Sequence, residues 1–316
     1  MTRGVDYARL DTEQGNAAAA GLDRLPTRRI LSLMSREDAR VVRAVRAAQG
    51  RIASASDLVA EALRDGGRLF LVGAGTSGRL AVLEAAECPP TFGTQPRQVQ
   101  AIMAGGRGAV FRSKEGAEDD ERAGRAEARR RGVGKGDVLG GVAASGVTPF
   151  VRGALAEAAR RGARTFLVTC ARQVGAPWQG QPGQTSLLVA GIGVDVRIEL
   201  AVGPEVLAGS TRLKAGSATK MALNMITLAA FVRLGKVYDR WMVDVRPMSR
   251  KLRERARRLV TTLTGLPDPL AEDLLRRAKR NVKTAVVMFR TGLPYRGARE
   301  LLTRAGGSLR EALVTR

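Results

Sequence analysis

The stretch RLFLVGAGTSGRLAVLEAAECPPTFG, residues 68–93, decides which fold the sequence predicts. Residues 69–72 are continuously apolar, which is typical of a parallel strand covered on both faces. Glycines and hydroxyl side chains follow, and together they favour a tight turn into a helix: Gly73, Gly75, Thr76, Ser77 and Gly78. Because the free N–H groups of such a helix end attract anions, we expect a phosphate-binding turn here.

A sugar phosphate is a better candidate for this turn than a dinucleotide. A dinucleotide-binding fold would place an acidic residue at the end of a second strand about 20 residues further on, and no obvious one is present. The alternative is a structural turn without a ligand, since one glycine-rich turn is a weak signal.

A second pattern of a strand, a turn and a helix occurs in DVLGGVAASGVTPFV, residues 137–151. An apolar segment leads into Ser145, Gly146 and Thr148, and Pro149 then opens a new helix. The carboxyl ends of parallel strands share one edge of a sheet, so the two turns are expected to line a single pocket there.

The chain resembles the bacterial N-acetylmuramic acid 6-phosphate etherases, which have the sugar isomerase (SIS) fold and are related to glucokinase regulatory proteins. The resemblance covers most of the chain in order. Its motifs are TEQGN (12–16), VGAGTSGR (72–79), ECPPTFG (87–93), EGAED (115–119), AASGVTP (143–149), GPEVLAGSTRLKAGSATKMALNM (203–225) and GKVYDRWMVDV (235–245). The run at 203–225 is the most specific of these.

The resemblance implies that the D-lactyl ether is removed from carbon 3 of N-acetylmuramic acid 6-phosphate, giving N-acetylglucosamine 6-phosphate and D-lactate, in the recycling of peptidoglycan amino sugars. A base takes the carbon 2 proton, lactate leaves, and water adds to the unsaturated intermediate. Paired carboxylates can do this if burial raises the pKa of at least one of them. The motifs assign Glu87 as proton donor and Glu118 as the second acid/base group.

Without the resemblance, both glutamates have ordinary interpretations. Glu118 lies in an acidic cluster, residues 115–121, of the kind that usually forms a solvated helix face. Cys88, Pro89 and Pro90 are expected to stop the helix beside Glu87 and so to fix the position of its carboxylate near the turn. The ordinary interpretation is that a glutamate at a helix end is simply exposed.

The run at 203–225 predicts a polar loop followed by an apolar, packed helix. The resemblance implies substrate contacts from this loop by Glu205, Ser210, Thr211 and Lys214. Lys214 or Arg212 could neutralise a phosphate or the lactate carboxylate, and pairing with Glu205 within the protein is an equal alternative.

The chain departs from the family pattern where hydrogen-bonding groups are usual. Val147 stands in place of Arg in the second turn, and Ala171 in place of Asn. The other departures are Ala19, Ala86, Ala208, Met248 and Ser249. These changes keep open a second function, a sugar-phosphate-binding regulatory protein without turnover. Glu87 and Glu118 oppose it.

The composition of the chain argues against several other classes of function. The 316 residues carry a formal net charge of +23, yet the cations are spread along the chain and only three Tyr and two Trp are present, so nucleic-acid binding is not favoured. A DNA-binding regulator would also need a helix-turn-helix domain before the sugar domain. With no His and two Cys, the sequence predicts neither a metal site nor another cofactor.

We expect a cytoplasmic protein. Two isolated cysteines indicate no disulfide framework, and the N-terminal residues have no apolar signal core. The longest apolar stretch, near 221–234, is expected to be too short to span a bilayer. A homodimer is expected by analogy, because members of this fold commonly build the pocket across a subunit interface.

The expected fold class is α/β, a SIS-type three-layer sandwich with a parallel sheet and a small C-terminal helical, UBA-like cap of three helices. Residues 1–50 are predicted to form an arm and a helix with Ser35 as its N-cap, residues 51–245 the sugar-phosphate domain, and residues 246–316 the cap. Strands are expected at 68–72, 99–103, 137–143, 164–169 and 186–190.

Overall fold

The computed structural model describes residues 10–172, 187–189, 192–245 and 249–314. It divides into two compact units, each described here by itself. The first contains residues 1–85 and 97–227, and the second contains residues 86–96 and 228–316. This division differs from the predicted boundaries, because the C-terminal ends of two helices belong to the second unit.

The first unit is built on a five-stranded parallel sheet in the order β2-β1-β3-β4-β7. Four of its strands lie where the sequence predicts them, so the parallel α/β prediction is confirmed. The strands are β1 (Leu69–Gly73), β2 (Val99–Met103), β3 (Val138–Val142), β4 (Arg164–Thr169) and β7 (Val196–Glu199).

The fifth predicted strand, 186–190, does not join this sheet. Its described part forms β5 (Leu187–Val189), which pairs antiparallel with β6 (Ile192–Val194). The adjacent β7 takes the place beside β4. Apolar composition predicted a strand here correctly, but it carries no information about which strand will be the neighbour.

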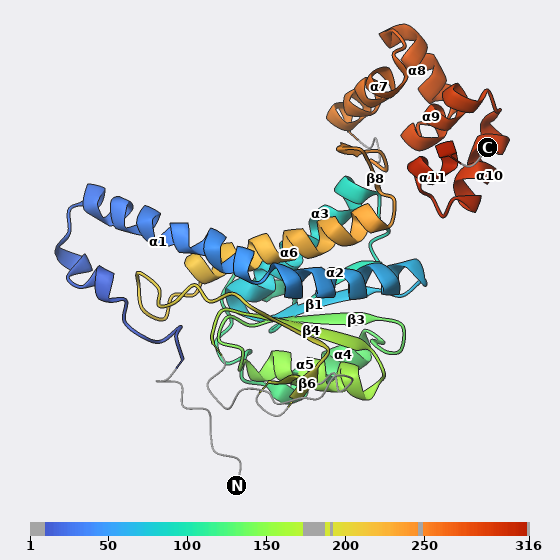
Figure 1. Ribbon diagram of the computed structural model, residues 1–316. Helices are drawn as coiled ribbons and strands as arrows, with labels where there is room; N and C mark the ends of the chain where they lie inside the picture. The colour runs from blue at the N-terminus through green and yellow to red at the C-terminus, as the bar shows by residue number, and fades with distance from the viewer. Residues whose placement is uncertain (1–9, 173–186, 190–191, 246–248, 315–316) are drawn as a thin grey trace. The chain divides into compact units, whose positions relative to one another are not determined.

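Helices cover both faces of the sheet, as a three-layer sandwich requires (Figure 1). Helix α2 lies against β1, β3 and β7, while α5 covers the other face and α4 packs on α5. The helices that begin in this unit are α1 (Thr27–Ala47), α2 (Gln49–Arg64), α3 (Gly75–Phe92), α4 (Glu121–Arg130), α5 (Pro149–Arg160) and α6 (Lys214–Arg233), with 3-10 turns η2 (Ala17–Ala19), η3 (Leu22–Arg24) and η4 (Arg107–Val110).

Two helix ends differ from the prediction. Helix α1 begins at Thr27, directly after Pro26, so Ser35 lies inside the helix and is not its N-cap. Helix α3 continues through Pro89 and Pro90 to Phe92. Both prolines sit in its last turns, where the missing N–H groups cost only the final hydrogen bonds of the helix.

Neighbouring side chains pack closely against both faces of the sheet, as two glycines in β3 show. A Cβ on Gly140 would lie 2.1 Å from the Phe166 ring, and one on Gly141 would lie 2.8 Å from Leu155 Cδ1. Residues of β3 therefore have to be small where β4 and α5 approach. The core on the α5 face contains Phe70, Val72, Ile102, Leu139, Phe150 and Leu167.

The second unit is helical and has its own core. Its described residues contain five complete helices, where the sequence predicted a cap of three: α7 (Arg250–Thr264), α8 (Asp268–Arg277), α9 (Val282–Thr291), α10 (Tyr295–Arg304) and α11 (Leu309–Val314). A short hairpin, β8 (Val237–Tyr238) with β9 (Trp241–Met242), precedes them. Pro269 stands in the first turn of α8, and Gly292 ends α9 with a φ of 72°.

Helix α6 is longer than its apolar stretch suggested. It spans 20 residues, and by length and composition alone it could cross a membrane. Of its most apolar window, 56% is buried within the structure, as in a core helix.

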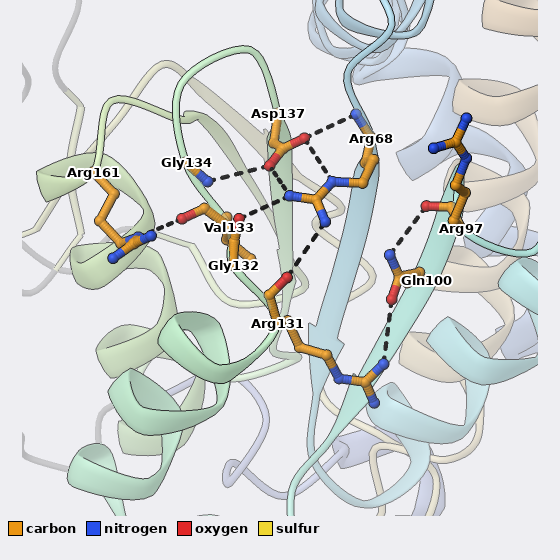
Figure 2. A network of polar contacts seen from close by, with 9 residues as sticks. All are labelled: Arg68, Arg97, Gln100, Arg131, Gly132, Val133, Gly134, Asp137 and Arg161. Atoms are coloured by element: carbon orange, nitrogen blue, oxygen red, sulfur yellow. Dashed lines mark hydrogen bonds and ion pairs between the residues drawn. The ribbon is translucent and has the colours of Figure 1, made fainter.

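The amino ends of β1 and β3 are fastened by a polar network around Asp137 (Figure 2). Its carboxylate accepts hydrogen bonds from Arg68 Nε at 3.0 Å and Nη2 at 2.7 Å, and from the N–H groups of Arg68 at 3.0 Å and Gly134 at 3.2 Å. Arg68 Nη2 also donates to the carbonyl of Gly132 at 2.7 Å. The bond to Asp137 raises the pKa of Arg68.

We expect Asp137→Ala to lower the free energy of unfolding by about 2–3 kcal/mol, because it leaves several donors without their acceptor at a buried position. Glu127→Ala, which removes the partly exposed ion pairs of Glu127 with Arg130 and Arg131, is the control and should change the free energy of unfolding by no more than about 0.5 kcal/mol. Urea unfolding followed by circular dichroism measures both variants. Equal effects would contradict the role of Asp137.

Candidate active site

The first predicted turn lies between β1 and α3, and its glycines serve two different purposes. Gly75 has a φ of +52° and opens α3. Gly73 and Gly78 instead allow close packing, since a Cβ on Gly78 would lie 2.6 Å from the Gly73 carbonyl oxygen. The half-buried Thr76 and Ser77 therefore stand in the first turn of α3, beside its free N–H groups.

The second predicted turn lies between β3 and α5. Gly146 has a φ of +75°, and a Cβ there would lie 2.9 Å from Thr169 Oγ1. The hydroxyl of Ser145 accepts a bond from the Val147 N–H at 3.4 Å, and α5 begins at Pro149 directly after Thr148. Both turns thus end in a helix N-terminus that carries hydroxyl side chains.

The two turns line one cavity of about 370 Å³. They meet because β1 and β3 are neighbours in register, with Gly73 opposite Val142. The lining includes seven of the predicted site residues: Gly75, Thr76, Ser77, Glu118, Ser145, Thr148 and Thr211. This volume falls in the range of small-molecule sites.

Glu118 is held at this cavity by the backbone. Its carbonyl oxygen accepts a hydrogen bond from the Phe150 N–H at 2.9 Å, which ties the EGAED loop to the first turn of α5. Although part of the residue stays exposed, burial raises the pKa of Glu118, and the charges of Asp119 and Glu115 add to the rise. A carboxyl group with a raised pKa is suited to acid–base chemistry near neutral pH.

Sequence reasoning missed several cavity residues. Thr12 and Glu13 lie in the TEQGN motif, which the sequence analysis quoted without giving it a role, and Asp119 and Gly209 also contribute. Val147 is the one departure from the family pattern that lines the cavity among the described residues. Met248 lies outside the described residues, and Ser249 caps α7 by accepting from the Leu252 N–H at 3.2 Å.

Other predicted site residues lie outside the described lining. Gly78 packs behind the first turn and Gly146 behind the second. The N–H of Ser210 donates to the Leu207 carbonyl at 3.0 Å within the loop before α6.

Glu205 and Lys214 are buried structural groups. The Glu205 carboxylate accepts from the N–H groups of Lys214 at 3.1 Å and Ala215 at 2.8 Å, and so caps α6. Lys214 Nζ donates to Glu37 Oε2 and to the Pro204 carbonyl, each at 2.6 Å. Lys214 therefore pairs within the protein, and its partner is Glu37 and not Glu205, the partner that one of the two sequence-based alternatives named.

The pKa of Glu205 is raised and the pKa of Glu37 is lowered. Burial raises the pKa of Glu205 against the opposing backbone hydrogen bonds. Burial alone would also raise the pKa of Glu37, but hydrogen bonds from Lys214 and from Asn16 at 2.7 Å outweigh it, and the net change is downward. No pattern in the sequence pointed to Glu37, which is 177 residues from Lys214.

Glu87 is exposed on α3 and is not among the described residues that line the cavity. Glu87 lies twelve helical positions after Gly75 in this continuous helix, a distance of about 18 Å along the axis. The expectation that Pro89 and Pro90 hold Glu87 beside the turn is wrong, because the helix does not stop there.

The described residues contain no group of three His, Cys, Asp or Glu side chains that could hold a metal ion. Both cysteines are buried. Burial raises the pKa of Cys170 to about 12.

Comparisons with known proteins find a SIS-domain family model and N-acetylmuramic acid 6-phosphate etherases. Residues 51–159 match the model of the glucokinase regulatory protein N-terminal SIS domain. The N-acetylmuramic acid 6-phosphate etherase of Gloeobacter violaceus is 50% identical over 310 residues, 98% of this chain and 96% of that relative. The etherase of Geobacillus thermodenitrificans is 48% identical over 279 residues, 88% and 90% of the two chains.

Among solved structures, phosphoheptose isomerase from Neisseria gonorrhoeae is similar with a TM-score of 0.40 and 20% identity, over 62% of this chain and 93% of that one. Phosphoheptose isomerase from Francisella tularensis gives a TM-score of 0.42 and 17% identity, over 66% and 98%.

We expect Lys214→Met to lower the free energy of unfolding by about 3 kcal/mol at pH 7, because it leaves Glu37 buried without its cation. The lowered pKa of Glu37 contributes stability above its ordinary range that is lost on acidification, so the gap between wild type and variant should narrow toward pH 4. Arg212→Met, at an exposed position in the same loop, is the control. Equal stability of the two variants would overturn the structural role of Lys214.

Proposed function

The chain belongs to the N-acetylmuramic acid 6-phosphate etherase family, and we propose how its cavity carries out the reaction of that family. The chain is a carbon–oxygen lyase that converts N-acetylmuramic acid 6-phosphate to N-acetylglucosamine 6-phosphate and D-lactate. Relatives that bear this name are 46–50% identical over nearly the whole chain. The observation that carries the proposed mechanism is the position of Glu118 beside two hydroxyl-bearing helix N-termini in one cavity.

The phosphate of the substrate binds at the two turns. Ser77 and Thr76 start α3, and Ser145 and Thr148 precede α5, so hydroxyl groups and free N–H groups converge on the cavity. Helix N-termini favour an anion without a charged side chain. This matters here because Val147 stands where the family pattern has Arg.

Glu118 acts on the sugar ring as an acid/base group. Once the ring opens to the aldehyde, the carbon 2 proton is acidic and Glu118 can remove it. The raised pKa of Glu118 makes its carboxylate a stronger base than an ordinary exposed one. Proton removal and loss of lactate leave a carbon 2–carbon 3 double bond, to which water adds at carbon 3.

Glu87 donates the proton to the departing ether oxygen, and it comes from the second copy of a homodimer. Its place on α3, about 18 Å along the helix from the turn, supports a donor supplied by the partner subunit. A two-fold dimer would complete two equivalent sites in this way.

The protein works in the cytoplasm on sugar phosphates released during recycling of peptidoglycan. The functional division at residues 50 and 245 is part of the same proposal. The presence of a separate core in the helical unit supports an independent role for it.

We expect Glu118→Gln to lower the rate of lactate release by at least about 100-fold, because an amide cannot exchange the proton. The base must be ionised, so wild-type activity should fall as the pH drops through the raised pKa of Glu118. Asp119→Asn removes a neighbouring negative charge and should move this acid limb to lower pH. Glu127→Gln, at a half-buried position on α4 that is not among the described residues lining the cavity, serves as control. Full activity of Glu118→Gln would refute the assignment.

Mixed dimers test the partner-supplied donor. Glu87→Gln and Glu118→Gln homodimers should each be almost inactive. After subunit exchange, half of the dimers are mixed and each has one intact site, so about a quarter of wild-type lactate release should return. If both carboxylates came from the same subunit, every site in the mixed dimers would keep one substitution, and no activity would return.

A further inference from the structure

A second, smaller cavity lies on the other side of Glu118. It has a volume of about 100 Å³ and shares Ala74, Gly75 and Glu118 with the main cavity. Its remaining wall includes Arg79, Met103, Ser113, Lys114 and Glu115. Glu118 therefore stands at the junction of two spaces, and the proposed function uses only one of them.

The two cavities differ in charge. Among the described residues that line the main cavity, the charged side chains are all acidic: Glu13, Glu118 and Asp119. The smaller cavity contains two cations, Arg79 and Lys114, alongside Glu115 and Glu118. A second anionic group of a ligand would be repelled in the main cavity and attracted in the smaller one.

Arg79 is fixed by its own hydrogen bonds. Its Nε donates to the Val110 carbonyl at 2.8 Å and its Nη2 donates to the Ala109 carbonyl at 2.9 Å. These bonds hold the guanidinium against η4 and leave its Nη1 protons for a ligand. A planar guanidinium fixed in this way is suited to a carboxylate.

Lys114 reaches the same cavity across a glycine. A Cβ on Gly105 would lie 3.0 Å from Lys114 Cδ, so the absence of a side chain there makes room for the lysine stem. Within the part of the chain that the structure describes, the Lys114 ammonium forms no ion pair. Ser113 beside it donates instead to Glu115 at 2.9 Å.

The substrate carries two anionic groups, which are attached to different carbons of the sugar. The phosphate is on carbon 6, and the lactyl ether, which ends in a carboxylate, is on carbon 3. With the phosphate at the two turns and the reacting carbons at Glu118, the lactyl arm extends past Glu118. The smaller cavity is the space that meets it, and its size is suited to a three-carbon group.

We propose that the cavity lined by Arg79 and Lys114 is the subsite for the lactyl carboxylate, and that these two cations distinguish the ether substrate from a hexosamine phosphate without a lactyl group. The proposal rests on the proposed function of the main cavity. It also gives the leaving lactate an electrostatic anchor beside the acid/base group, since the ether bond breaks to a product that keeps its carboxylate.

The test is Lys114→Met, with Lys114→Arg as the charge-preserving variant and Lys135→Met as the control at an exposed turn before β3. Lys114→Met should raise the KM for N-acetylmuramic acid 6-phosphate by about 10–100-fold and weaken inhibition by D-lactate, as expected for a lost charge-assisted bond. Inhibition by N-acetylglucosamine 6-phosphate should be unchanged, and Lys114→Arg should restore most of the affinity.

Equal loss of affinity for both sugar phosphates would overturn the subsite, because Lys114 would then serve the phosphate or the fold. Unchanged affinity for the lactyl compound would overturn it as well. Calorimetric titration of the wild type and Lys114→Met with both sugar phosphates separates this proposal from the proposed function. If the wild type released no lactate, a selective loss of binding to the lactyl compound would still support the subsite.

Discussion

The cavity depends on the in-register parallel pairing of β1 with β3. Gly73 lies opposite Val142, so the chain leaves both strands at the same level and enters two helices side by side. Gly73 and Gly78 allow the first of these helices to begin in contact with the strand end. Asp137 and Arg68 fasten the same two strands at the opposite edge of the sheet.

The charge of the chain gives a poor guide to the charge of its site. The net charge is +23, yet the described walls of the main cavity carry acidic side chains and no basic ones. Anion binding there falls to helix N-termini and hydroxyl groups, whose dipoles need no counter-charge. The two cations that do approach the site lie beyond Glu118, where a second anionic group would be held without drawing the phosphate away from the turns.

The buried ion pair of Lys214 and Glu37 helps to position one wall of the cavity. It joins the first turn of α6 to α1, and Asn16 bonds to the same carboxylate. Because both charges are buried, the pair contributes geometric specificity more than net stability. It holds the loop that carries Gly209 and Thr211, so the position of this wall of the cavity depends on residues far from any ligand.

The sequence by itself determined the four central strands, both turns and the presence of Glu118 in a recognisable motif, because apolar runs, glycines and helix caps act over a few residues. It did not determine that β7 completes the sheet, that Glu37 is the partner of Lys214, or that Arg79 and Lys114 share a cavity with Glu118. It also failed for the end of α3, which continues through Pro89 and Pro90 to Phe92. These features depend on which distant segments pack together, and packing is set by the whole set of buried contacts and not by spacing along the chain.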